Sequence, residues 1–173
     1  MIQDDLGYRI QDSGERRKFD TGAVRDISEG KGRCDLMPLE LIGRHLEDDI
    51  LVNIGRYIYS GDERHLWTAM YSFSQAAAYA AGEVWSGCYG VILDVSHHYE
   101  EGAKKYKERN WEQGIPLHSF IDSAVRHYLE YKSGYVDERH DRAFYWNLLG
   151  ALWTQENKPE MIDLPFGEKE EDK

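Results

Sequence analysis

The sequence has few cysteines and no long hydrophobic run. Cys34 and Cys88 are the only two cysteines among its 173 residues. Two thiols this far apart form neither a disulfide framework nor a close metal-binding pair, which favours a reducing compartment. No stretch approaches the ~20 apolar residues of a membrane span, and the first residues, MIQDD, have neither the basic nor the apolar part of a signal peptide. The sequence therefore predicts a cytoplasmic protein without a membrane partner.

An excess of positive charge is also missing. The formal net charge is -11, and this disfavours a nucleic acid polymer as partner, because non-specific binding to such polymers depends on Lys and Arg that neutralise phosphates. The basic residues that are present gather in two segments, 16–33 and 104–109. Basic patches on an acidic protein suit a small phosphorylated ligand, although ordinary solvated surface charge is an alternative for each of these residues.

The rest of the composition is that of a folded, helical protein. Hydrophobic residues make up 41% of the chain, which includes five Trp and twelve Tyr, and 173 residues suffice for one domain with a full core. Apolar residues recur at every third or fourth position, as in amphipathic helices. We expect these helices over residues 38–60, 66–82, 84–106, 117–133 and 138–155.

These patterns predict an all-α fold, a compact bundle of about five helices. The glycine-rich residues 1–35 are expected to form an irregular arm, and the acidic residues 161–173 a disordered, flexible tail. No stretch shows a strand pattern long enough to predict a sheet. Residues 1–160 are therefore expected to form a single helical domain.

Polar residues occupy positions where the helical period calls for apolar ones. His127 shares a predicted inward stripe with Phe120 and Tyr131, and His140 and Asn147 share another on the next helix. A buried imidazole or amide is stable only with a hydrogen-bond partner, a ligand or a metal. Either these are satisfied core residues, or two neighbouring helices contribute them to one binding site.

A third line of polar residues lies on the helix predicted over 84–106. Asp94, His98, Glu101 and Lys105 follow one another at spacings of four, three and four, so all can face one cavity. Helical bundles hold divalent metals with such carboxylates and imidazoles, and carboxylate oxygens suit Mg²⁺ or Mn²⁺. The alternative is the solvated flank of an amphipathic helix.

Several stretches resemble a known family. They cover residues 19–26 (FDTGAVRD), 30–38 (GKGRCDLMP), 99–106 (YEEGAKKY) with 109–111 (RNW), and 122–127 (DSAVRH), followed by His140 and Asn147. Together they resemble phage and prophage proteins of the dATP/dGTP diphosphohydrolase family, which are similar to all-α MazG-type pyrophosphohydrolases. Relative to shorter members, residues from about 45 to 90 look like a helical insertion.

The resemblance implies hydrolysis of a purine (deoxy)nucleoside triphosphate to its monophosphate and pyrophosphate, in the cytoplasm of a phage host. MazG-like enzymes use Mg²⁺ or Mn²⁺ on paired Glu-x-x-Glu and Glu-x-x-Asp motifs, which this sequence lacks; its nearest equivalent is His98-x-x-Glu101. The implied catalytic residues are Glu101 and His98, and the implied metal ligands are Glu101, Asp122 and Asp141. The residues expected to bind nucleotide are Arg25, Lys31, Arg33, Lys105, Arg109, Asn110, Trp111, Arg126, His127, His140 and Asn147.

Two other functions fit the same residues. A non-catalytic protein could sequester a nucleotide or a cyclic nucleotide that signals host defence, which requires Arg, Lys and aromatic residues but no metal carboxylates. A purely structural protein could use the buried polar residues only to specify packing. Because many aromatic residues are distributed over few helices, we also expect apolar surface that pairs copies of the chain in a homo-oligomer.

Overall fold

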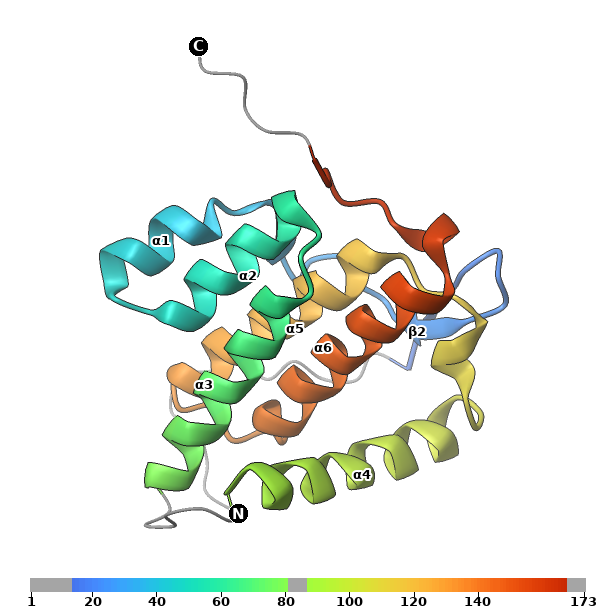
Figure 1. The fold of residues 1–173 in the computed structure, drawn as a ribbon. Coiled ribbons are helices and arrows are strands. Elements are labelled where there is room, and N and C mark those ends of the chain that lie inside the picture. Colours follow the sequence, from blue (N-terminus) through green and yellow to red (C-terminus); the bar gives the residue numbers. More distant parts are fainter. Residues whose placement is uncertain (1–13, 81–86, 168–173) are drawn as a thin grey trace.

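Helices dominate the computed structural model, which describes residues 14–80 and 87–167 (Figure 1). Within these residues the chain forms six α-helices and one two-stranded hairpin, which confirms the all-α prediction. The strands are β1 (Arg16–Lys18) and β2 (Val24–Asp26), and the helices are α1 (Leu39–Leu46), α2 (Asp49–Ser60), α3 (Arg64–Ala80), α4 (Gly87–Lys105), α5 (Leu117–Lys132) and α6 (His140–Asn157). Short 3₁₀ turns cover Cys34–Leu36, Asn110–Gln113 and Pro159–Met161. None of the described helices is long and apolar enough to cross a bilayer.

The helix predicted over 38–60 is two helices, α1 and α2. Glu47 ends α1 in a left-handed conformation, with φ of 55°, and Asp48 begins α2 by accepting hydrogen bonds from the Ile50 and Leu51 amides at 3.1 and 3.2 Å. The apolar residues keep their three-to-four spacing across this break, so periodicity alone does not reveal it. The cap chemistry of Asp48 was the available signal.

Replacing Asp48 with alanine should lower the free energy of unfolding by about 2–3 kcal/mol, because it removes a helix cap and a buried partner together. Its second oxygen accepts a hydrogen bond of 2.6 Å from the hydroxyl of Tyr128, a core residue of α5. Asp49→Ala is the matched control, since Asp49 is exposed and its carboxylate has no such contact. Urea denaturation measures both variants, and equal losses would contradict the double role of Asp48.

The core lies where α5 and α6 pack side by side, with α3 against them (Figure 1). Phe120 of α5 and Phe144 and Leu148 of α6 are fully buried, and the Phe73 ring of α3 lies 4.7 Å from that of Phe144. Gly134, just beyond the end of α5, has a φ of 79°, a left-handed conformation that glycine adopts readily at helix ends. The short connection of residues 133–139 makes α5 and α6 antiparallel neighbours.

Helix α4 lies along the other side of α6 (Figure 1). It was predicted to begin at Val84, but residues 81–86 lie outside the described part of the chain. Val95 of this helix is buried in the core, whereas Tyr89, Ile92 and Leu93 are exposed. The helix therefore packs along one face and leaves apolar side chains on another.

The arm contains a hairpin that the sequence patterns missed. Residues 16–26 form an antiparallel hairpin in which Arg17 is paired with Arg25, because three-residue strands are too short to show an alternating pattern. Asn110 anchors this hairpin as an additional strand would, by donating to the Val24 carbonyl at 2.8 Å and accepting from the Val24 amide at 2.9 Å.

The C-terminal segment is packed through the last described residue. Phe166 lies edge-on to Tyr57 of α2, with the ring centres 5.5 Å apart, and the Gly167 amide donates to the Tyr59 carbonyl at 2.8 Å. The part of the predicted flexible tail from 161 to 167 therefore contacts the body of the protein. Residues 168–173 lie outside the described residues.

Candidate functional site

A cavity of about 1320 Å³ lies between the N-terminal arm, the end of α4, the 107–112 segment and the α5–α6 pair. All but two of the predicted catalytic, metal and nucleotide-binding residues line it; the exceptions are Asp141 and His140. Segments distant in sequence therefore converge on one space. Its volume is ample for a small organic ligand.

Arg25 joins three elements around this cavity. Its guanidinium donates to the Ser119 carbonyl and the Ser123 hydroxyl, both at 3.1 Å, and to the Asn147 side-chain oxygen at 2.7 Å. It also lies over the rings of Phe120 and Trp146, at 5.1 and 5.5 Å from their centres. Burial lowers the pKa of Arg25 to about 10, so the group stays charged at neutral pH without a carboxylate partner.

Several more cations line the cavity, among them Lys31, Lys105 and Arg126. The Lys31 side chain forms no hydrogen bond or ion pair with any described residue, and burial lowers its pKa. Lys105 donates to Asp26 at 2.9 Å. Arg126 donates to Asp122 at 3.2 Å and to Ser123 at 3.1 Å. Of these three, Lys31 is the cation without a partner among the described residues, and it is therefore available to an anionic ligand.

Four other predicted nucleotide-binding residues, Arg33, Arg109, Asn110 and Trp111, have partners in the protein. Arg33 forms a two-point ion pair with Asp35 at 2.6 and 2.7 Å, and Arg109 pairs with Glu112 at 2.7 Å. Trp111 packs edge-on against Trp153, with ring centres 4.9 Å apart. Together with Asn110, which holds the hairpin, these residues shape the cavity wall.

The three predicted metal carboxylates do not converge. Glu101 lines the cavity and forms no hydrogen bond or ion pair with a described residue. Asp122 accepts from the Cys34 amide at 2.6 Å and from Arg126. Asp141 binds Arg139 at 2.9 and 2.7 Å and does not line the cavity. Of the three, Glu101 is the carboxylate without such a partner.

His98 lies beside Glu101 on the same face of α4. Its ring packs 5.5 Å from that of Trp146, and burial, aided by the nearby His127 and Arg25, lowers its pKa to about 4. The imidazole is therefore neutral at pH 7 and can accept a hydrogen bond or a proton.

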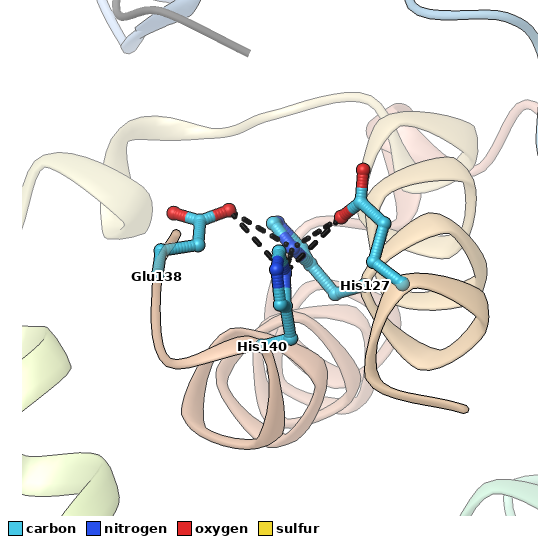
Figure 2. Close-up of side chains that lie close together, drawn as sticks. His127, Glu138 and His140 are labelled. Carbon is cyan, nitrogen blue, oxygen red and sulfur yellow. Dashed lines mark hydrogen bonds and ion pairs between the residues drawn. The ribbon is translucent and has the colours of Figure 1, made fainter. Parts of the chain in front are cut away.

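His127 and His140 come together in a cluster with two glutamates (Figure 2). Within the described residues, the only group of three or more His, Cys, Asp and Glu side chains that could hold a metal ion consists of His127, Glu130, Glu138 and His140. Sequence reasoning singled out both histidines but missed Glu130, which lies three residues after His127 and therefore on the same face of α5.

Glu130 is ionised at neutral pH despite its position. Burial alone would raise its pKa, but His127 and His140 outweigh burial and lower the pKa to about 2. The side chain of Glu130 is about one-tenth exposed and that of His140 only 1%. The cluster therefore sets a buried carboxylate against two imidazoles at one end of the cavity.

Comparison with protein-family models identifies one match. Residues 75–164 match the model described as dATP/dGTP diphosphohydrolase, N-terminal, which covers more than half of the chain and extends from α3 past the end of α6. No curated protein and no solved structure matches the chain. The resembling stretches in the arm precede the matched region, whereas those in α4, α5 and α6 lie within it. The chain therefore belongs to the dATP/dGTP diphosphohydrolase family, and the matching model is that of the family's N-terminal domain.

Proposed function

We propose that the protein hydrolyses a purine (deoxy)nucleoside triphosphate to its monophosphate and pyrophosphate, with Mg²⁺ or Mn²⁺. Family membership supports the reaction type. The observation that carries the proposal for this chain is the cavity, which is lined by the cations Arg25 and Lys31 and by Glu101 and His98. A triphosphate requires such fixed cations, because they stabilise the charge of the transferring phosphoryl group.

Different residues of the cavity bind phosphate, hold the metal ion and accept a proton. Lys31, Arg126 and Arg25 bind phosphate oxygens. Glu101 would hold Mg²⁺ together with the triphosphate, because Mg²⁺ is commonly held by one or two carboxylates plus substrate phosphates. When bound, Mg²⁺ would lower the pKa of a water molecule and offset phosphate charge. Water attacks the α phosphorus, the bond to the β-phosphate oxygen breaks, and pyrophosphate leaves. Neutral His98 accepts a proton from the attacking water.

Pyrophosphate release tests the reaction directly. Purified protein is incubated with each dNTP and NTP, with Mg²⁺, Mn²⁺ or EDTA, and dATP or dGTP with metal should give monophosphate and pyrophosphate in equal amounts. Glu101→Gln should reduce turnover by ~10²-fold or more while leaving the melting temperature within a few degrees, because one carboxylate charge is lost without a change in size. Metal-independent release, or full turnover by this variant, would contradict the proposed role of Glu101.

A second candidate is a non-catalytic protein that sequesters a nucleotide or cyclic nucleotide. Asp122 and Asp141 are both bound by arginines, and this favours binding without cleavage. Such a protein would be stabilised in a thermal-shift assay by an intact nucleotide and would release no pyrophosphate. Silence in both assays would exclude a nucleotide function.

The biological setting is part of the proposal. We expect a phage-related role in the cytoplasm, where nucleoside triphosphates occur, and no partner among nucleic acid polymers. The exposed Tyr89, Ile92 and Leu93 on α4 support the proposed homo-oligomer, since apolar residues gathered on one helix face are typical of protein contacts.

A further inference from the structure

The cluster of His127, Glu130, Glu138 and His140 has donors suited to a transition metal. His127 and Glu130 belong to α5, Glu138 lies in the connection to α6, and His140 is the first residue of α6. One atom from each of the four lies within 4.8 Å of the others. Figure 2 shows the Glu138 carboxylate beside the imidazoles of His127 and His140.

Five of the six separations between these atoms are close to the edges of a tetrahedron around a metal ion, and the sixth, between Glu130 and Glu138, is within 4.8 Å. The Nδ1 atoms of His127 and His140 are 3.1 Å apart, and Oε2 of Glu130 lies 3.3 and 3.1 Å from them. Oε1 of Glu138 lies 3.2 Å from His127 Nδ1 and 3.6 Å from His140 Nδ1. Tetrahedral bonds of ~2.0–2.2 Å to a central ion place neighbouring ligand atoms about 3.3–3.6 Å apart.

Glu130 provides an independent indication of a ligand. Its residue is 8% exposed, and its Oε2 atom has no hydrogen-bond partner in the described part of the protein although it lies next to both imidazoles. Neither Glu130 nor Glu138 forms an ion pair with a described Lys or Arg. A buried oxygen atom without a hydrogen-bond partner is costly, and a metal ion at the centre of the cluster would remove this cost.

Asp137 orients one of the imidazoles. Its Oδ1 lies 2.9 Å from Nε2 of His140, so an N–H at Nε2 can donate to Asp137 and Nδ1 is the ring nitrogen that can bind a metal ion. Metal-binding histidines commonly have a carboxylate behind the ring, which fixes the tautomer and raises the basicity of the ligand atom.

We propose that His127, Glu130, Glu138 and His140 form a four-coordinate site for a divalent ion of the zinc class, which fastens the α5–α6 connection at one end of the cavity. Two imidazoles select zinc-like ions over Mg²⁺, which demands octahedral oxygen coordination. Four protein ligands leave no open position, as in structural zinc sites. The site is separate from Glu101 and does not depend on the proposed hydrolysis.

Zinc binding to the full-length protein tests the site without reference to activity. After EDTA treatment and desalting, calorimetric titration with Zn²⁺ should show one equivalent bound and a raised melting temperature, because binding energy of a structural metal adds to folding energy. Titration with Co²⁺ should give the intense visible absorption of tetrahedral cobalt. Excess Mg²⁺ should not displace either ion.

Two variants test which residues bind the ion, and both change a partly exposed residue that tolerates substitution. Glu138→Gln and His127→Gln should each weaken Zn²⁺ binding at least ~10-fold and reduce the thermal shift. Glu40→Gln is the matched control, since Glu40 is an exposed carboxylate of α1 that pairs with Arg56, and it should bind Zn²⁺ like the wild type. The proposal is overturned by the absence of a one-equivalent Zn²⁺ site, by octahedral Co²⁺ absorption, by displacement with Mg²⁺, or by unchanged affinity in both variants.

Discussion

Replacing Arg25 with methionine should lower kcat/KM for the nucleotide by ~10²–10³-fold, the effect expected when a fixed charge that stabilises a transition state is removed. Hydrogen bonds to Ser119, Ser123 and Asn147 use three of the five guanidinium N–H groups. The remaining two can donate to phosphate. Methionine keeps the stem of the side chain over Phe120 but has no charge, so steady-state pyrophosphate release measures mainly the loss of the cation.

Two variants distinguish the effect of the Arg25 charge from the effect of its structural contacts. Arg25→Lys keeps the charge but cannot make the three-way contact, and it should recover only part of the activity. Arg56→Met is the control, because Arg56 pairs with Glu40 on the surface of the α1–α2 region and does not line the cavity. If Arg25→Met and Arg56→Met had the same kcat/KM, Arg25 would be only a clamp for the arm.

Gly150→Ala should destabilise the protein by about 2–3 kcal/mol and lower its melting temperature by about 4–12 °C. A Cβ atom at Gly150 of α6 would lie 2.4 Å from Cε1 of Phe120. Phe120 is fully buried and packs beside Trp146, so its ring cannot move away without disturbing the α5–α6 core. Thermal denaturation followed by circular dichroism measures the shift.

The control for this substitution has the opposite expected sign. Gly90 lies in α4, where an added Cβ would meet nothing within 4 Å. Gly90→Ala should therefore stabilise the helix by up to ~1 kcal/mol through helix propensity alone. A melting temperature of Gly150→Ala at or above that of Gly90→Ala would show that α5 and α6 are less closely packed than the structure indicates.

Most of the helical architecture was predictable because apolar periodicity is a local signal. The helices over 117–132 and 140–157 begin and end within two residues of the predicted bounds. The break at Glu47 and the short hairpin were not predictable from this signal. The break leaves the apolar period in phase, and three-residue strands are held by Asn110, a partner some 86 positions away along the chain.

The candidate site was predictable as a set of residue types but not as a set of contacts. The stripes that contain His127, His140 and Asn147 do converge on neighbouring helices. Asp122 and Asp141, however, have arginine partners, and sequence spacing cannot show which charges neutralise each other.

By itself, the sequence determined the all-α class, the approximate helices and the family resemblance, because these depend on local spacing and on motifs read along the chain. The tertiary structure decided which polar residues share one space. It placed Arg25 against α5 and α6, left Glu101 without an ion pair to any described residue and joined His127 and His140 to Glu130 and Glu138. The physical reason is that the chemistry of a charged side chain depends on its partners, and only the packing of distant segments determines those partners.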